Sequence, residues 1–410
     1  MTNQPKHSAQ RQVTLPPATG GGRFRLRLFI SIVFATTCMP GATRTAQAEC
    51  YAVTNVGTVA GATELQVRDM NNAGEIVGWA VANNVYQGFL YANGLMISLG
   101  SLGGQGCQAH GINDARQVVG AAATATGQEH AFIYTGGQMI DLGTLGGTRS
   151  SAAAINNSGL VTGFSTAGNG TYRLFTWQNG VMTDAGLVGL TNCEVWDINS
   201  SGTVIGLNQL ITSQLLAFNW TSSGGFQTLG TFGGAEGYPY RINDNGQIVG
   251  AIWTGQTTLL GARIYHAFLY RNGATTDLGT LGGSSSGANG INNSGAVVGW
   301  SQVSTGQHAF IYDISNGMRD LNSLISPTSG WVLEAATVIN DAGQIAGVGR
   351  LNGARRIFLL TPSQTDADDN GLIDACEARS APDTSDSCGA GLPITLATVF
   401  ISLCFMKRRD

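Results

Sequence analysis

The heptapeptide DLGTLGG occurs at residues 141–147 of this 410-residue chain and again at 277–283. Related copies read SLGSLGG at 98–104, DAGLVGL at 184–190 and TLGTFGG at 228–234. A stretch that returns with variation at a regular distance is typical of proteins built from structural repeats. The repeat around this heptapeptide therefore decides the fold.

A second motif, Asn-x-x-Gly-x-(Ile/Val)-x-Gly, recurs every 42 to 49 residues. Its seven copies begin at Asn71, Asn113, Asn156, Asn199, Asn243, Asn292 and Asn340. The second copy departs from the pattern, because Arg116 stands where the others have the first Gly. Periods of this length with strand-rich content predict a propeller or a linear array.

Each unit reads as four antiparallel strands. Between residues 150 and 187 the segments are SSAAAIN, LVTGFST, YRLFTWQ and VMTDAGL. Asn179-Gly180 supplies the positive φ angles that a two-residue hairpin turn needs. The first segment is poor in bulky side chains, which suits strands crowded around a propeller axis. DLGTLGG then ends one blade and starts the crossing to the next.

The two ends of the repeat region complement each other. The seventh unit stops after RIFLL (356–360), without a fourth strand, whereas YAVTNVGTVAG (51–61) reads as a fourth strand that precedes the first unit. A closed ring would use this strand to complete the last blade and remove two exposed edges, and an open solenoid has no need of it. We therefore predict an all-β, seven-bladed β-propeller of four-stranded antiparallel blades over 49–362, closed by the N-terminal strand.

Residues 1–48 have the features of a secretory signal peptide. They contain six basic residues and no acidic one, an apolar stretch at 28–39 and the small-residue site Ala46-Gln47-Ala48. The alternative, a membrane-spanning helix, is disfavoured because the apolar stretch is too short. We expect an exported protein, extracellular or at the cell surface.

The C-terminal region has two parts. In the acidic linker 363–391, DADDNGLIDACE (366–377) follows the spacing of an EF-hand calcium loop. The predicted Ca²⁺ ligands are Asp366, Asp368, Asn370, Asp374 and Glu377, with the backbone carbonyl of Leu372. The loop resembles those of dockerins and thrombospondin-like calcium repeats, and the alternative is a solvated acidic linker.

We predict that residues 392–410 are an apolar helix (392–406) with a basic end, Lys407-Arg408-Arg409, which serves as a membrane anchor or a sorting tail. An apolar segment followed by basic residues is a stop-transfer pattern. The segment resembles the C-terminal sorting signals of exported bacterial proteins, which implies membrane contact at least transiently. The alternative is a buried terminal helix.

HAFLY (266–270), INNSGAVVGWS (291–301) and DLGTLGG (277–283) together resemble the HAF family of extracellular bacterial repeat proteins. The resemblance covers about 51–360 and implies an exported repeat protein. It brings no established reaction or active site.

Charge and cysteine content narrow the possible partners. The chain has 21 basic and 25 acidic residues. Because six basic residues lie in the leader, the mature form keeps 15, with a net charge of about −10, which argues against nucleic-acid binding. Five cysteines remain between leader and tail, Cys50, Cys107, Cys193, Cys376 and Cys388. Disulfides can form in an oxidising space. The odd number leaves at least one cysteine unpaired, and the pairing stays open.

Four aromatic residues interrupt the small-residue first strands and are the predicted ligand-binding residues: Trp196, Tyr238, Tyr240 and Trp331. Aromatic side chains near a channel mouth can stack on a sugar or a peptide. The alternative is that they belong to the core and fill the interior of a wide propeller. The predicted function is a non-catalytic binding module for a glycan, peptide or envelope protein.

The alternative function is a hydrolase or lyase acting on a polysaccharide. It requires carboxylates that converge on one cleft, and Glu194, Glu236 and Glu334 are candidates, as is Glu129. His130, His266 and His308 share a strand position that accepts Leu216 in another unit, so we interpret them as structural.

Overall fold

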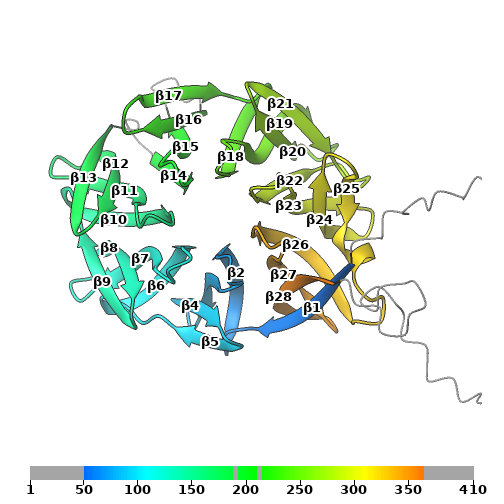
Figure 1. The fold of residues 1–410 in the computed structure, drawn as a ribbon, viewed down its shortest axis with the longest axis horizontal. Helices are drawn as coiled ribbons and strands as arrows, with labels where there is room; N and C mark the ends of the chain where they lie inside the picture. Colours follow the sequence, from blue (N-terminus) through cyan, green and yellow to red (C-terminus); the bar gives the residue numbers. More distant parts are fainter. Residues whose placement is uncertain (1–49, 188–192, 210–214, 364–410) are drawn as a thin grey trace, which may run out of the picture. The chain divides into compact units, whose positions relative to one another are not determined.

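The computed structural model describes residues 50–187, 193–209 and 215–363. The chain divides into two compact units, Met1–Gln47 and Ala48–Asp410, and all described residues belong to the second. Within them the strands form seven four-stranded antiparallel sheets, arranged around a ring as blades (Figure 1). The predicted seven-bladed propeller is confirmed.

Six of the blades run from the axis outward in chain order, and in blade 7 the outermost strand is β1 (Cys50–Gly57) (Figure 1). Blade 1 comprises β2 (Ala62–Met70), β3 (Ile76–Ala82), β4 (Val85–Ala92) and β5 (Leu95–Ser98). Blade 2 comprises β6 (Gly103–Ile112), β7 (Val118–Thr124), β8 (Glu129–Thr135) and β9 (Gln138–Gly143). Blade 3 comprises β10 (Gly146–Ile155), β11 (Val161–Ala167), β12 (Tyr172–Gln178) and β13 (Val181–Leu187). Blade 4 comprises β14 (Cys193–Ile198), β15 (Val204–Gln209), β16 (Leu215–Thr221) and β17 (Gly225–Gly230).

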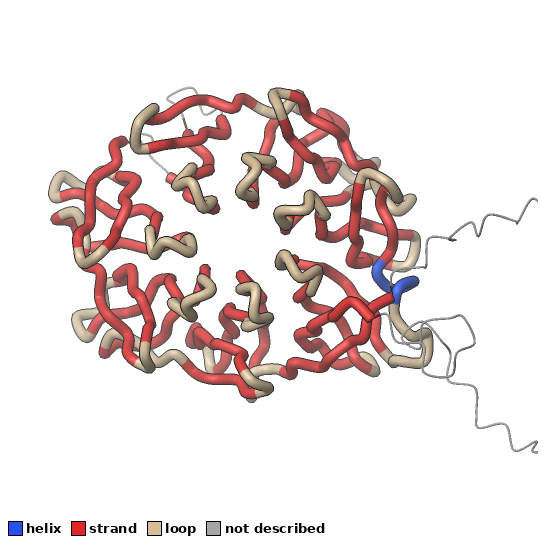
Figure 2. Tube along the Cα trace, in the orientation of Figure 1, coloured by secondary structure: helices blue, strands red, loops and turns tan. Residues whose placement is uncertain are grey.

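The remaining blades follow the same order. Blade 5 comprises β18 (Glu236–Ile242), β19 (Ile248–Thr257), β20 (Arg263–Arg271) and β21 (Ala274–Gly279). Blade 6 comprises β22 (Ser286–Ile291), β23 (Val297–Val303), β24 (Gly306–Asp313) and β25 (Gly317–Asp320). Blade 7 comprises β26 (Trp331–Ile339), β27 (Ile345–Leu351), β28 (Ala354–Ser363) and β1 (Cys50–Gly57). A 3₁₀ turn, η1 (Leu321–Leu324), joins blades 6 and 7 (Figure 2).

Blade 3 shows how closely local sequence determines the strands. The predicted segments 172–178 and 181–187 coincide with β12 and β13. The inner strand differs, because β10 begins at Gly146, four residues earlier than predicted. Gly146 pairs with Ala167, and a bulge follows before regular pairing resumes at Ser150. The crossing from blade 2 to blade 3 is therefore only Thr144 and Leu145.

The aspartate of DLGTLGG connects the two outer strands of a blade. Asp141 accepts a hydrogen bond from the Gly143 backbone N–H at 2.7 Å and lies 2.8 Å from Nδ1 of His130. The equivalent pair, His266 and Asp277, has the same 2.8 Å separation, and Asp277 accepts from Gly279. The recurring histidines thus orient the turn at the outer edge of the blade, which agrees with the structural interpretation.

The hydrophobic core lies between neighbouring blades. The third strand of every blade contributes one phenylalanine to it. The set Phe89, Phe132, Phe175, Phe218, Phe268, Phe310 and Phe358 is buried, each side chain at most 3% exposed. Phe175 pairs with Gly163 on β11. A Cβ atom at Gly163 would overlap the Ser151 carbonyl and approach the Phe175 ring, which is why the motif ends in glycine.

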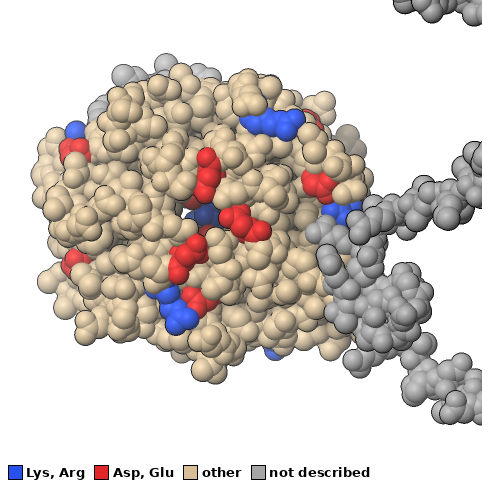
Figure 3. Space-filling model, viewed as in Figure 1, with Lys and Arg blue, Asp and Glu red and all other residues tan. Residues whose placement is uncertain are grey.

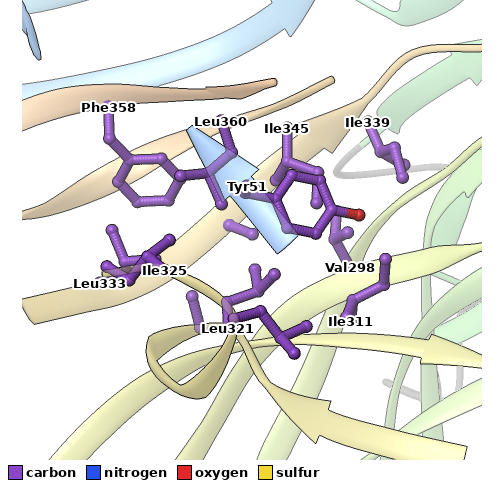
Figure 4. Packing of buried hydrophobic residues seen from close by; sticks show 13 residues of the cluster. Tyr51, Val298, Ile311, Leu321, Ile325, Leu333, Ile339, Ile345, Phe358 and Leu360 are labelled. Atoms are coloured by element: carbon purple, nitrogen blue, oxygen red, sulfur yellow. The ribbon is translucent and has the colours of Figure 1, made fainter. Parts of the chain in front are cut away.

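The ring is closed by β1, which pairs with β28 in antiparallel register from Cys50↔Ser363 to Gly57↔Ile357. Tyr51 is 1% exposed and packs with Phe358 and Leu360 of β28 and with side chains of β26, β27, blade 6 and η1 (Figure 4). The predicted closure by the N-terminal strand is confirmed. It removes the free edge that β28 would otherwise present to solvent.

A second, polar closure runs around the axis. Each motif asparagine donates a side-chain hydrogen bond to the backbone carbonyl of the equivalent asparagine in the next blade, and Asn340 donates to Asn71 at 3.1 Å. We call these residues the asparagine ring: Asn71, Asn113, Asn156, Asn199, Asn243, Asn292 and Asn340. All are 2–6% exposed. Seven hydrogen bonds of 3.0–3.2 Å therefore join seven blades in an unbroken circle.

The other end of each amide group organises the local turn. In blade 3, Oδ1 of Asn156 accepts from the backbone N–H groups of Ser158 and Leu160. Aspartate could accept these bonds but could not donate across the blade boundary, so only asparagine satisfies both demands. The first motif glycine lies in the left-handed region, with φ of 79° at Gly159. Arg116 adopts φ of 58° there, and its guanidinium contacts Glu75 of blade 1.

The structure defines the state of two cysteine side chains. Cys50 is disulfide-bonded, and Cys107 is a buried free thiol. The predicted signal peptide, the calcium loop and the apolar tail at 392–410 all lie outside the described residues. Across 50–187, 193–209 and 215–363, no helix has the length and hydrophobicity needed to cross a membrane.

Candidate functional site

The axis of the ring holds two pockets that share one wall, Arg241. One pocket opens at the asparagine ring and has a volume of about 180 Å³. The other, which we call the aromatic pocket, has a volume of about 420 Å³ and is lined by Trp196, Tyr240 and Trp300, among others. The second volume lies in the range of typical small-molecule sites.

Arg241 separates the two pockets by an ion-pair network. Its guanidinium lies 3.4 Å from Asp69 and 3.5 Å from Asp197, and it donates to the backbone carbonyl of Arg68. These contacts join blades 1, 4 and 5 across the axis. Burial raises the pKa of Asp197 to about 6 against the opposing effect of Arg241. Both carboxylates also accept a backbone N–H bond, from Ile112 and Ile242.

Acidic side chains surround the central opening on one face of the ring (Figure 3). The pocket at the asparagine ring is lined by Asp114, Asp244 and Asp341. Asp244 accepts from Ser200 and from Asn293, and these bonds lower its pKa despite partial burial. Asp341 likewise accepts from Asn293. These carboxylates bind neighbouring blades to one another, and no cluster able to hold a metal ion occurs among the described residues.

The aromatic pocket is built from a β-bulge that recurs in every inner strand. In each blade the regular pairing of the first two strands skips one residue, three positions before the ring asparagine. The skipped residues, which we call the bulge ring, are Arg68, His110, Ala153, Trp196, Tyr240, Asn289 and Thr337. All seven line the aromatic pocket and all are partly exposed. A bulge redirects its side chain out of the strand's alternation, and here it directs seven side chains toward the axis.

Trp196 and Tyr240 of the bulge ring form an aromatic pair from adjacent blades. Their ring centroids lie 5.1 Å apart with an interplanar angle of 54°. Burial, with contributions from Tyr265 and Glu194, raises the pKa of Tyr240 to about 12, so the phenol stays protonated at neutral pH. The indole Nε1 of Trp196 is buried and has no hydrogen-bond partner among the described residues. The pair offers a tilted apolar surface with one hydroxyl.

Arg68 and His110 occupy the equivalent positions in blades 1 and 2. The Arg68 guanidinium makes neither a hydrogen bond nor an ion pair with any described residue. Burial, aided by Arg241 and opposed by the charge of Asp69, lowers its pKa to about 10. Nδ1 of His110 lies 2.8 Å from the Ala152 carbonyl, so this nitrogen carries the proton. Burial, aided by the charge of Arg68, lowers the His110 pKa to about 4. The imidazole is therefore neutral near pH 7, with Nε2 as an acceptor.

Replacing His110 by glutamine is expected to reduce the loss of stability in acid. Because the pKa of His110 is lowered from 6.5 to about 4, the folded protein binds this proton less tightly than the unfolded chain. Its contribution to stability is complete above pH 6.5 and is lost as the pH falls toward 4. Urea denaturation midpoints between these pH values measure the effect. Asn289→Ala changes an uncharged residue of the same bulge ring, so its denaturation midpoint should fall with decreasing pH as steeply as that of the parent. An equally steep fall in His110→Gln would contradict the lowered pKa of His110.

The four aromatic residues predicted from the sequence do not lie together. Trp196 and Tyr240 line the aromatic pocket. Tyr238 packs between blades, with its hydroxyl donating to Glu236 at 2.7 Å. Trp331 lies against Phe358, 6.1 Å between ring centroids, beside the closing core. The bulge at Tyr240 explains the separation of Tyr238 from Tyr240, since two residues spaced by two would otherwise share a face.

Sequence reasoning missed Arg68, Asn289 and the role of His110. A signal was available, because the position three residues before each ring asparagine carries seven different residue types. The flanking positions are mostly small or apolar. Trp300 and Arg355, which also line the aromatic pocket, come from β23 and β28 and share no such position.

The candidate catalytic carboxylates are separated. Glu334 lines the aromatic pocket and pairs with Arg350 at 2.7 Å. Glu194 lines a side pocket, and Glu236 pairs with Arg263 at 2.6 Å. Glu129 pairs with Arg149 at 2.9 Å. No two of the three leading candidates line the same pocket within the described ranges.

Comparison with known proteins yields one family match. Residues 274–388 match a family described as "Protein of unknown function (DUF3466)". This segment is little more than a quarter of the chain. No curated protein matches. The resemblance to the HAF family stays a prediction.

Several solved structures are similar at low identity. The WD40 β-propeller domain of Doa1 is 15% identical, with a TM-score of 0.41, over 77% of this chain and 98% of that one. The β-propeller domain of the trilobed protease from Pyrococcus furiosus is 9% identical, with a TM-score of 0.47, over 72% and 96%. YCF48 bound to D1 peptide is 10% identical, with a TM-score of 0.45, over 76% and 96%. At these scores they carry no information on what this chain binds.

Proposed function

We propose that this protein is an exported, surface-associated binding module that holds part of a glycan or peptide in the aromatic pocket, without catalysis. The bulge ring is the observation that supports this proposal. Seven structurally equivalent positions face one pocket and differ in charge, size and polarity.

The contrast with the framework explains why this variation points to binding. The ring asparagines and the core phenylalanines are the same residue in all seven blades, because each makes the same contact in every blade. A bulged side chain that faces the axis is released from that constraint. The residue type at such a position can therefore be one that suits a ligand. Binding residues held on a rigid scaffold are a common arrangement for recognition.

The double variant Trp196→Ala/Tyr240→Ala is expected to lose ligand binding by at least about a hundredfold. Two rings that each contribute about 1.5 kcal/mol or more would give such a change. An array of glycans and peptides probed with the full chain would find the ligand, and titration of intrinsic fluorescence would measure affinity. Trp253→Ala is the matched control, because Trp253 stacks under Arg263 at 4.2 Å and does not line the pocket. Equal affinity in the double variant and the parent would refute the site.

The polysaccharide hydrolase or lyase is the less supported alternative. Its chemistry requires two carboxyl groups at a defined separation across one cleft. Glu236 and Glu334 are each paired with an arginine, and Glu194 lines a different pocket from Glu334. We therefore assign no catalytic residue.

Export and calcium binding remain part of the proposal on the sequence alone. The leader at 1–48, the loop at 366–377 and the tail at 392–410 would place the propeller at the cell surface on a calcium-stiffened stalk. This location suits a module that meets its ligand outside the cell.

A further inference from the structure

The bulge ring is chemically polarised. Its aromatic members, Trp196 and Tyr240, belong to the adjacent blades 4 and 5, and its basic members, Arg68 and His110, belong to blades 1 and 2. In a ring of seven, blade 1 lies across the axis from the junction of blades 4 and 5, as the positions of β2, β14 and β18 show (Figure 1). A ligand in the pocket therefore meets an apolar surface on one side and a cation on the other.

Blade 3 leaves room between these two sides. Its bulge-ring member is Ala153, the smallest of the seven. A side pocket of about 250 Å³ lies there, lined by Arg68, His110, Ala153, Glu194 and Trp196 among others. The indole of Trp196 and the guanidinium of Arg68 are thus walls of one space, which the alanine keeps open.

Arg68 forms no ion pair with any described residue, although one carboxylate, that of Glu194, lines this space with it. The nearby carboxylates of Asp69 and Asp197 are engaged by Arg241 and by the backbone N–H groups of Ile112 and Ile242. A partly buried guanidinium that makes no ion pair or hydrogen bond with the described residues favours an anionic ligand, and a carboxylate can accept two of its N–H bonds at once.

The other groups in the space suit hydroxyl groups. His110 presents a neutral acceptor at Nε2. Glu194 provides carboxylate oxygens at the same wall. The aromatic rings are tilted by 54° and do not form the parallel slot that a flat aromatic ligand would need. Acceptors for hydroxyl groups beside an aromatic face are features of a sugar site.

We propose that this side pocket binds a carboxylated sugar, a hexuronic acid unit of an acidic glycan. The carboxylate pairs with Arg68, the C–H face of the sugar lies against Trp196, and ring hydroxyls donate to His110 and Glu194. This inference rests on the proposed binding function and narrows it to one ligand class.

The test is calorimetric titration of the full chain with oligomers of galacturonate and of glucuronate. Each oligomer is matched with its uncharged methyl ester. The acid form is expected to bind about tenfold to a hundredfold more tightly than the ester, since a hydrogen-bonded charge pair contributes on this scale. Arg68→Gln should lower affinity for the acid to that for the ester, and Arg68→Lys should lose less. Ala153→Phe should abolish binding of both by filling the space.

Arg263→Gln is the matched control, because Arg263 pairs with Glu236 and lines neither the aromatic pocket nor the side pocket. Thermal unfolding of each variant separates loss of fold from loss of contact. Equal binding of acid and ester, or an Arg68→Gln protein that binds the acid as tightly as the parent, would overturn the inference. The proposed function would survive either result if Trp196→Ala/Tyr240→Ala still lost binding. Absence of binding to every one of these oligomers would also overturn the inference, and the glycan and peptide array then decides the proposed function.

Discussion

Tyr51→Ala is expected to lower the free energy of unfolding by about 4 kcal/mol, the cost of removing a large buried aromatic side chain. Tyr51 is 1% exposed and packs in the cluster that joins β1 to blades 6 and 7. Tyr51 pairs with Pro362, and no other strand pair in the described part of the chain joins residues so far apart in the sequence. The substitution therefore weakens the closure itself, and it leaves the hydrogen bonds of β1 in place.

Urea denaturation followed by intrinsic fluorescence measures this effect. Thr54→Ala is the control, because Thr54 lies on the same strand and is exposed, and it should change stability by less than about 0.5 kcal/mol. A loss as small in Tyr51→Ala as in Thr54→Ala would mean that β1 is a dispensable addition to an otherwise stable ring.

Asn156→Ala is expected to cost about 3 kcal/mol, because several buried hydrogen bonds are lost together. The change removes the donor to the Asn199 carbonyl at 3.1 Å and the acceptor for the Leu160 N–H. Asn156→Asp separates the two roles. The carboxylate still accepts the turn's hydrogen bonds but places a negative oxygen against the Asn199 carbonyl, so it should also destabilise.

Chemical denaturation again supplies the measurement. The control is Asn157→Ala, the next residue, whose side chain is exposed and bonds to Asp114 at 2.8 Å. It should cost under about 1 kcal/mol, because water replaces an exposed hydrogen-bond partner. If Asn156→Asp proved as stable as the parent, the bonds between blades would be incidental and the turn alone would explain the asparagine.

The hydrogen bonds of the asparagine ring are of two kinds, one within a turn and one between blades. The turn that the motif forms is local, since the Oδ1 atom of Asn156 accepts hydrogen bonds from residues two and four positions later. The bond from each Nδ2 atom spans 42 to 49 residues, or 269 at the junction of Asn340 with Asn71. Only the closed ring brings those partners together.

Only part of the candidate site could be predicted from the sequence, because the direction of a side chain in these strands depends on the bulge. Off-pattern aromatic residues in the first strands were visible, and Trp196 and Tyr240 do line the pocket. Whether such a side chain faces the axis depends on the bulge, which shifts the alternation by one residue. Trp331 precedes both bulges of β26 and packs against the closing core instead.

The sequence by itself determined the number of blades, the strands within them and the strand that closes the ring. These follow from periodicity, turn residues and the complementarity of two chain ends, all of which are readable along the chain. Tertiary structure alone decided that seven bulged residues converge on one pocket, that Arg241 lies between the two axial pockets, and that Arg68 and Trp196 line one space. The reason is geometric: contacts across the axis join blades that are distant in the chain, and no local pattern encodes which of them meet.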